Sequence, residues 1–503
     1  MTLSPLDLSQ LGAVAPEILL LALALGILAL DLLTKRGNNN PRELGFITAI
    51  GLIAILAFSV ATAPPPNMGA AVLGGMMRYD LFTSVMRGIF LLAGAFTALL
   101  TVDFRPARAG GEFYALLVLA VLAMGLMAGA NDMILLYLAT EVASISLYLL
   151  AGFMRDDKRS SEAGLKYFVF GAVTSTVMLY GLSLIYGIVG STNYTSIQQA
   201  FELGAGGYLG IAAMIMVVVG FLFKTSAVPL HFWAPDVYDG APTPVSGFIS
   251  TASKTAGFAI MLRFLEGAFT PEYSAAGNVW PYLMIPVAIL TMFVGNLGAA
   301  VQTSVKRMLA FSSVGQAGYV FIGVAAFANV RGDTVPQALA AIVFYLATYM
   351  ITNIAAFAVV GVISQRVGGE NYKDFAGLGR RSPYLALAMV AAMVSLLGAP
   401  PMVGFAGKFY LFRSAIAGAA NDPRMVGLVV VGVINVLISV YYYLGVVKAM
   451  YVDKTAKDNT PLKVAPATMF VIVVCAIGTI ATLVGATPVY NLALEAAKAF
   501  LSN

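Results

Sequence analysis

Charged residues are scarce in this sequence. Only 11% of its 503 residues are Asp, Glu, Lys or Arg, and 60% are hydrophobic, whereas a soluble domain carries about 25% charged residues. The mean hydropathy is +0.87, and apolar runs of the roughly 20 residues needed to cross a bilayer follow one another along the chain. The scarcity of charge therefore excludes a soluble globular protein and predicts a polytopic membrane protein.

Cysteine and histidine are scarcer still. The single cysteine, Cys475, lies in an apolar run, and the single histidine is His231. One cysteine excludes a disulfide framework and an iron–sulfur cluster held by this chain alone, and one histidine excludes a haem held by two histidines. The glycine-rich patterns of phosphate-binding loops are also missing. We therefore expect no cofactor or metal on this chain.

The excess of positive charge is small and unevenly distributed. The net charge is +5, without the basic, aromatic-rich clusters that bind nucleic acid. Basic residues concentrate in alternate loops, which marks the cytoplasmic side of a membrane protein. One side holds about seventeen of them: Lys35, Arg36, Arg42, Arg105, Arg108, Arg155, Lys158, Arg159, Lys306, Arg307, Arg366, Lys373, Arg380, Arg381, Lys454, Lys457 and Lys463. The other holds about six: Arg78, Arg263, Arg331, Arg413, Arg424 and Lys498. We expect a multi-pass protein of the cell membrane with both termini on the non-cytoplasmic side, which requires an even number of spans.

Fourteen segments are predicted to cross the bilayer as helices, so the expected fold class is all-α. They fall near residues 14–33, 44–62, 80–101, 113–130, 132–154, 161–190, 208–229, 245–265, 280–303, 308–328, 336–364, 383–413, 425–450 and 464–486, and a short amphipathic tail follows. The loops are short and rich in Pro, Gly, Asn and charge, which predicts a single membrane domain over 1–503. Acidic Asp7 lies before the first run and Glu17 lies at its start, where a signal peptide would carry basic residues, which favours a transmembrane helix over a cleavable signal.

Prolines interrupt two of these helices. The seventh span runs into Pro229, and the twelfth contains Pro400 and Pro401. Proline removes a helical hydrogen bond, and in lipid the freed backbone groups must be buried in protein or line a wet cavity. Two interrupted spans at corresponding positions are typical of inverted-repeat transporters. Their separation by five helices predicts two inverted repeats and one last transmembrane helix, at 113–265, 280–450 and 464–486.

Four ionisable residues lie deep within predicted spans. Such a residue costs about 2.5–3.5 kcal/mol at a helix centre and is a functional candidate for that reason. Glu141 lies near the middle of the fifth span and is too short to reach the membrane surface. Lys224 lies in the interrupted seventh span, Lys254 in the eighth, and Lys408 just past the interruption of the twelfth. We predict that this row carries protons across the bilayer.

The chemistry of buried lysine supports this prediction. A dry environment disfavours the charged form of a lysine, and a nearby carboxylate restores it. A Glu141–Lys224 pair would therefore hold the proton while the two groups are together and release it when they separate. Lys254 would receive the proton next, and Lys408 would be the last site.

Other polar residues are predicted to support the row. Lys166 and Lys306 lie near span ends, where reaching out to the interface is the alternative, and His231 follows the first interruption, where an isolated histidine is usually a packed residue. Five further polar residues could hold water between the sites or join neighbouring helices: Gln316, Asn296, Asn353, Asn435 and Tyr319.

Longer motifs surround these residues, at 129–132, 140–142, 146–152, 162–168, 223–244, 253–255, 305–319 and 398–408. Together they resemble subunit N of complex I, the NADH-quinone oxidoreductase, which is called subunit 2 in mitochondria. The resemblance extends over about residues 14–486. The run 223–244, which passes through the first interruption, is its most specific part.

The resemblance implies a bundle of fourteen helices with two inverted five-helix repeats, acting as an antiporter-like proton channel in the membrane arm of a larger complex. It assigns the family's key glutamate to Glu141, its broken-helix lysine to Lys224, its central lysine to Lys254 and its terminal lysine to Lys408. The implied partners are the other antiporter-like and small membrane subunits, together with the lipid bilayer. FMN, iron–sulfur clusters and quinone are expected in other subunits.

Alternatives remain open at this point. Gln316 replaces a histidine common in bacterial members and, with 236–238 and 441–443, resembles the cyanobacterial and chloroplast version, so the electron donor is NADH or ferredoxin. A subunit of a multisubunit Na+/H+ antiporter shares the fold and is the main alternative function, although the segments around Gln316 and 236–238 favour complex I. A passive structural subunit is the third possibility.

Overall fold

The computed structural model describes residues 8–34, 41–66, 68–104, 110–271, 274–454 and 461–502. Six residues used in the sequence analysis lie outside these ranges: Asp7, Lys35, Arg36, Arg105, Arg108 and Lys457. The described chain is almost entirely helical, as predicted.

The helices of the first half are α1 (Leu8–Thr34), α2 (Pro41–Ala61), α3 (Leu81–Val102), α4 (Gly111–Gly129), α5 (Met133–Ala151), α6 (Lys158–Val189), α7 (Tyr194–Glu202), α8 (Gly207–Thr225), α9 (Trp233–Gly240), α10 (Thr243–Phe248), the π-helical segment η2 (Ile249–Ser253) and α11 (Lys254–Ala268). The second half contains α12 (Ala275–Ala300), α13 (Val305–Asn329), η3 (Gly332–Thr334), α14 (Val335–Val367), η4 (Tyr372–Phe375), α15 (Leu378–Arg381), α16 (Pro383–Leu397), α17 (Val403–Gly418), α18 (Arg424–Tyr451), α19 (Pro466–Val484) and α20 (Ala486–Leu501).

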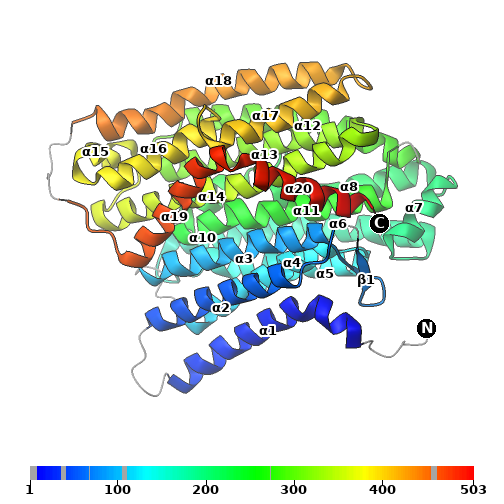
Figure 1. Ribbon diagram of the computed structural model, residues 1–503, viewed down its shortest axis with the longest axis horizontal. Helices are drawn as coiled ribbons and strands as arrows, with labels where there is room; N and C mark the ends of the chain where they lie inside the picture. Colours follow the sequence, from blue (N-terminus) through cyan, green and yellow to red (C-terminus); the bar gives the residue numbers. More distant parts are fainter. Residues whose placement is uncertain are drawn as a thin grey trace.

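The predicted number of spans agrees with the structure. Eleven helices in the described ranges are long and apolar enough to cross a membrane. The continuous segment α10–η2–α11, the interrupted pair α16 and α17, and α19 supply three more, which gives fourteen. The start of α1 and the end of α20 lie at the same end of the bundle as α7 (Figure 1), as an even number of spans requires.

Both predicted interruptions are present. Helix α8 ends at Thr225, four residues before Pro229, and the chain passes through Ser226 in the left-handed conformation (φ 56°) before α9 begins. Helix α16 ends at Leu397, where Gly398 has φ 84°, and α17 begins at Val403. Each interruption therefore exposes the last carbonyl groups of a membrane helix inside the protein.

The helices form layers across the molecule (Figure 1). The layer of α1, α2 and α3 lies at one side and α18 at the other, while α19 and α20 return to the middle. Close packing in the second half depends on small residues. A Cβ atom on Gly295 of α12 would lie 2.2 Å from the backbone nitrogen of Gly315 in α13, so these two helices touch through their backbones.

A buried ion pair joins the three N-terminal helices. Arg87 of α3 is fully buried, and its NH2 group lies 2.7 Å from Oε1 of Glu17 in α1. Its NH1 group donates a hydrogen bond to Ser59 of α2 (3.3 Å). The charge of Arg87 is therefore neutralised inside the protein, where it ties α1 and α2 to α3.

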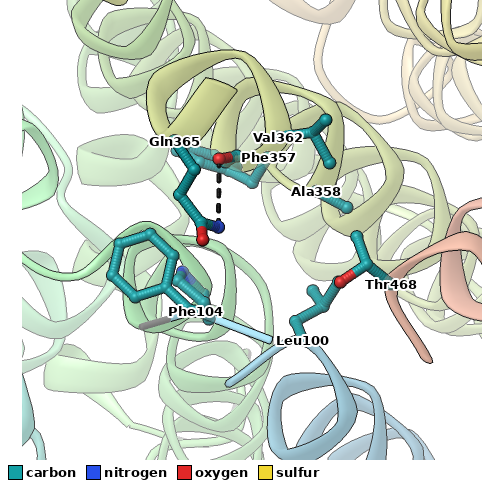
Figure 2. Close-up of a pocket in the computed structure, with 9 residues that line it drawn as sticks. Leu100, Phe104, Phe357, Ala358, Val362, Gln365 and Thr468 are labelled. Atoms are coloured by element: carbon teal, nitrogen blue, oxygen red, sulfur yellow. Dashed lines mark hydrogen bonds between the residues drawn. The ribbon is translucent and has the colours of Figure 1, made fainter. Parts of the chain in front are cut away.

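Helix α19 joins the core beside α3 and α14. Figure 2 shows Leu100, Gln365 and Thr468, one residue from each of these three helices, lining the same small pocket. The backbone nitrogen of Thr468 donates to Asp103 at the end of α3 (3.2 Å). The predicted amphipathic tail is helix α20, which packs against α3 and α14 and buries Phe500.

One small element departs from the predicted all-α fold. Strands β1 (Ala70–Val72) and β2 (Met77–Tyr79) form an antiparallel hairpin between α2 and α3, with Ala70 opposite Tyr79. Three-residue strands leave too short a pattern to be recognised in the sequence. The hairpin lies at the same end of the bundle as α7 (Figure 1).

Candidate proton-relay site

Glu141 and Lys224 face the same small cavity but form no ion pair. The cavity lies between α5, α6 and α8. Nζ of Lys224 donates to Oγ of Ser144 (2.9 Å), and Oγ of Ser175 donates to Oε1 of Glu141. The direct pair predicted from the sequence is thus absent in this structure. Ser144 lies nearly one turn after Glu141 on α5. Its hydroxyl oxygen accepts the hydrogen bond from Lys224 that the carboxylate of Glu141 was expected to accept.

Lys254 lies at the first residue after the π-helical segment η2 and contacts the second half of the protein. Its Nζ donates to Oγ (2.6 Å) and to the carbonyl oxygen (2.7 Å) of Ser313 in α13. It also lies 5.8 Å from the centre of the Tyr238 ring of α9. The segment α10–η2–α11 therefore connects the two halves through this lysine.

Lys408 binds the exposed end of the interrupted helix before it. Its Nζ donates to the carbonyl oxygens of Leu396 (2.9 Å) and Leu397 (3.0 Å), the last residues of α16. Such carbonyls have no partner within their own helix and carry partial negative charge. The amine also lies 4.2 Å from the centre of the Tyr319 ring. The second interruption thus creates the binding site of its lysine.

The three lysines share one environment. Their exposed fractions are 2% for Lys224, 2% for Lys254 and 3% for Lys408. Each is held by hydroxyl or carbonyl oxygens, and none forms an ion pair with a described carboxylate. A buried charge without a partner of opposite sign is costly. The site therefore holds three amines whose charged forms would be compensated only by dipoles.

A cluster of hydroxyl and amide groups lies between Lys254 and Lys408. Nε2 of Gln316 donates to the hydroxyl oxygen of Tyr443 (2.9 Å) and to the carbonyl of Leu396 (2.8 Å), which also accepts from Lys408. The hydroxyl of Tyr345 donates to Oε1 of Gln316. The hydroxyls of Tyr443 and Ser312 are also bonded. We call Ser312, Gln316, Tyr345 and Tyr443 the Gln316 cluster.

Sequence reasoning identified Gln316 but missed its partners. Single Tyr and Ser residues in apolar helices are common and carry no signal by themselves. The run 441–443 was noted only for its resemblance to cyanobacterial and chloroplast chains, and it contains Tyr443. The other predicted polar residues mainly join helices: Asn296 donates to Asn435 (3.0 Å), and Asn353 donates to Ser250 (2.7 Å).

Buried hydroxyls without a hydrogen-bond partner gather between Lys224 and Lys254. The hydroxyl of Tyr238 lies close to those of Ser226 and Ser313, outside hydrogen-bond geometry. Among the described residues, the hydroxyls of Ser226, Tyr167, Ser253 and Thr255 are also buried without a hydrogen-bond partner. Buried polar groups in native proteins are nearly always satisfied, commonly by internal water. This region therefore has the donors and acceptors of a hydrated path between the two lysines.

Lys306 is buried rather than directed to the interface. Its exposed fraction is 4%, and its Nζ donates to the carbonyls of Asp239 (3.0 Å) and Ala241 (2.9 Å). It also lies 3.6 Å from Oε1 of Glu370. The alternative reading of this lysine, that it reaches out to the interface, is wrong because Asp239 at the end of α9 and Ala241 just after it offer oxygen ligands inside the protein.

Lys166 is half-exposed and belongs to a cluster of charged residues that includes Arg307, the residue after Lys306 on α13. Its Nζ lies 2.8 Å from Oδ2 of Asp236 and 2.7 Å from Glu162, and NH2 of Arg307 lies 2.7 Å from Oδ1 of Asp236. We call Lys166, Asp236 and Arg307 the Asp236 cluster. Burial alone would raise the pKa of Asp236, but the hydrogen bonds and charges of Lys166 and Arg307 lower it below its usual value. The cluster joins α6, α9 and α13.

His231 lies in the first interruption, as predicted, and is half-buried. Its Nδ1 atom is buried without a hydrogen-bond partner. No hydrogen bond in the described ranges joins it to the lysines, so its supporting role remains a prediction.

Three comparisons relate this arrangement to known proteins. Residues 130–439 match the family model described as NADH:quinone oxidoreductase/Mrp antiporter, TM. NADH-quinone oxidoreductase subunit N of Moorella thermoacetica is 39% identical over 495 residues, covering 98% of this chain and 99% of that protein. NAD(P)H-quinone oxidoreductase subunit 2 of Rippkaea orientalis is 38% identical over 461 residues, covering 90% of this chain and 85% of that protein. A chain of respiratory complex I from Thermus thermophilus with bound aureothin has a TM-score of 0.78 and 30% identity, covering 95% of this chain and 98% of that one.

Proposed function

This chain belongs to the subunit N family of NADH-quinone oxidoreductase, and on this premise we propose how its buried lysines take part in proton transfer. It is an antiporter-like, proton-translocating membrane subunit of that enzyme, and its partners are the other membrane subunits of the complex. Quinone reduction takes place elsewhere in the complex. The task of this chain is therefore to move protons when the redox reaction drives them.

The proposed relay runs from Glu141 to Lys224, then to Lys254 and Lys408. The observation that carries it is that all three lysines are almost fully buried and bound only by neutral oxygens. A permanent ion pair would fix the proton, because the remaining charge would be left buried and alone. Dipolar ligands bind both the charged and the neutral amine, so each lysine can pass through both states.

The first transfer starts in the cavity shared by Glu141 and Lys224. Approach of the carboxylate favours protonated Lys224, and its withdrawal favours release. The structure has the separated arrangement, in which Lys224 binds Ser144. From Lys224 the proton passes along the hydroxyls of Ser226 and Tyr238 and through internal water to Lys254.

The second transfer crosses the Gln316 cluster. A glutamine amide does not take up a proton as a histidine does, whereas hydroxyls both donate and accept hydrogen bonds. Tyr443 and Tyr345 flank Gln316, and they carry the hydrogen-bonded path in place of a histidine. Gln316 and Lys408 share the carbonyl of Leu396 as an acceptor, so this carbonyl holds the two groups close together, and the last proton step to Lys408 goes through internal water.

The repeat boundaries, membrane orientation and cofactor locations that we propose are those expected from the sequence. We place the inverted repeats at 113–265 and 280–450 and the last transmembrane helix at 464–486, with both termini on the outer side of the cell membrane. Lys166, Lys306 and His231 support proton entry near the Asp236 cluster. FMN, iron–sulfur clusters and quinone belong to other subunits, and the electron donor is NADH or ferredoxin.

The test uses the assembled complex in sealed vesicles. Replacing Lys224 by Met or by Arg is expected to lower proton pumping and coupled quinone reduction by about tenfold or more, the factor that corresponds to about 1.4 kcal/mol. Met removes the proton site, and Arg cannot release its proton. The Arg variant keeps the charge, so a merely structural role for Lys224 predicts that it retains activity.

The matched control is Lys448→Met on α18, where the side chain is 67% exposed. This variant is expected to pump as the wild type does. Unchanged turnover and unchanged protons per electron in both Lys224 variants would overturn the relay. Proton movement that requires sodium would favour the alternative antiporter function, since the family model includes Mrp antiporters.

A further inference from the structure

A second polar cavity lies far from the Asp236 cluster, at the end of the bundle that holds α7 and the C-terminus (Figure 1). It measures about 680 Å³ and is lined from β2, α7, α11 and the end of α20. Its charged residues are Arg78, Arg263 and Glu266, and Asn131 and Gln198 add polar groups. None of these residues belongs to the proposed relay.

Arg263 is rigidly held but keeps one unused donor. Its NH2 group lies 2.6 Å from Oδ1 of Asp80, and its Nε donates to the carbonyl of Ala128 (3.0 Å). The rings of Phe82 and Phe500 lie 4.8 and 4.6 Å from the guanidinium carbon. The side chain is 3% exposed, yet its NH1 group has no hydrogen-bond partner. A buried donor of this kind is costly unless a ligand accepts from it.

Arg78 and Glu266 are both half-buried and both unpaired. In the described ranges neither side chain makes a hydrogen bond or an ion pair, although the charge of Arg331 attracts the carboxyl group of Glu266. Burial and the charge of Arg263 lower the pKa of Arg78 to about 10 against the attraction of Asp80, so Arg78 stays charged at neutral pH. The cavity therefore offers one unsatisfied cationic group and one unsatisfied carboxyl group at separate positions.

Exposed apolar and aromatic side chains of the kind found at the membrane–water interface lie at the same end of the bundle as the cavity. The turn after α7 exposes Leu203 to 90% and Tyr208, on the first turn of α8, to 92%. Apolar and aromatic side chains so exposed at the ends of transmembrane helices mark the membrane–water interface. Gln198 of the adjacent α7 lines the cavity. A membrane lipid is thus the charged molecule that this position brings to the site.

We propose that this cavity binds the headgroup of a zwitterionic phospholipid that carries a primary ammonium group. The phosphate accepts hydrogen bonds from Arg78 and from NH1 of Arg263, a geometry that guanidinium groups favour. The ammonium donates to Glu266. The site is independent of the proton relay.

The test measures lipid retention by the purified, assembled complex. The complex is stripped of lipid, incubated with equal amounts of phosphatidylethanolamine, phosphatidylcholine and phosphatidylglycerol, and analysed by native mass spectrometry. Wild type is expected to retain phosphatidylethanolamine in preference to the other two. Arg78→Gln should reduce retention of all three phosphates by about tenfold, as expected for the loss of a charge-assisted hydrogen bond.

Glu266→Gln separates the two halves of the proposal. It should remove the preference for phosphatidylethanolamine while retaining phosphate binding. The matched controls are Arg413→Gln and Glu495→Gln, two surface charges whose side chains bond Gln337 and Lys498. Equal retention in wild type and both cavity variants would overturn the proposal. Soluble phosphoethanolamine that binds the lipid-free complex as tightly as the lipid does would assign the site to a free metabolite instead.

Discussion

Tyr443 lies where the Gln316 cluster meets α18. Its hydroxyl bonds both Ser312 and Gln316, and the side chain is fully buried. Removing the hydroxyl leaves the ring in place but takes away the link between the two halves of the cluster. The proton path from Lys254 to Lys408 should then be interrupted.

Tyr443→Phe is therefore expected to lower coupled proton pumping by about tenfold, the factor that corresponds to about 1.4 kcal/mol. Tyr441→Phe is the matched control, since Tyr441 lies on the same helix and is 73% exposed. Pumping rates in vesicles, normalised to the amount of assembled complex, distinguish the two variants. Equal rates in both would remove Tyr443 from the path.

The sequence identified the lysines because charge in an apolar run is conspicuous. It missed Tyr238, Tyr345 and Tyr443 because a tyrosine in a membrane helix is ordinary, and its position toward a partner depends on how helices cross. It also expected Lys224 to bind Glu141, whereas Ser144 takes that bond. Distances of this kind follow from packing, which a single sequence does not specify.

Between elements, the Asp236 cluster joins α6, α9 and α13. The pKa of Asp236 is lowered in the folded protein, because the effect of Lys166 and Arg307 exceeds that of burial. Its contribution to stability is therefore present above the unfolded value of about 3.9 and is lost as the pH falls through the lowered folded value.

Asp236→Asn is expected to destabilise the complex by about 1 kcal/mol, the upper range for exposed ion pairs. The difference in thermal midpoint between wild type and variant should stay constant from pH 8 to 5 and shrink only at more acidic pH. Asp453→Asn, at an exposed pair with Lys448, is the control and should change the midpoint little. A difference that disappears near neutral pH would contradict the assignment.

Sequence patterns predicted most elements well, since long apolar runs and prolines are local signals. The helix ends at Thr225 and Leu397 lie just before the prolines that predicted them. The hairpin of β1 and β2 and the π-helical segment η2 were not predicted. A three-residue strand has too little periodicity, and η2 differs from an α-helix only in its hydrogen bonds.

For the whole molecule, the layer of α1, α2 and α3 depends on a charge pair at its centre. Glu17 and Arg87 are 7% and 0% exposed. Their oppositely charged groups neutralise each other, and neither could face lipid alone. The attachment of the first helix to the rest of the protein is therefore sensitive to either residue.

Glu17→Ala is expected to cost about 3–5 kcal/mol, because it leaves Arg87 buried and unpaired. The double variant Glu17→Leu with Arg87→Leu should recover most of that loss, since it removes both charges. Thermal unfolding and the yield of assembled complex measure the effect, and Glu43→Ala, at an exposed position in α2, is the control. A double variant no better than the single one would show that the charges themselves are not the cause.

The Gln316 cluster has a consequence for where positive charge can reside along the proposed relay. Lys254 and Lys408 can each hold an extra proton and its charge, whereas the amide and hydroxyl groups between them are neutral at neutral pH. The Gln316 cluster would therefore pass a proton on without holding it. In the proposed relay, a proton that leaves Lys254 is therefore expected either to reach Lys408 or to return. A chain with histidine in place of Gln316 would gain a residue that can hold the proton between them.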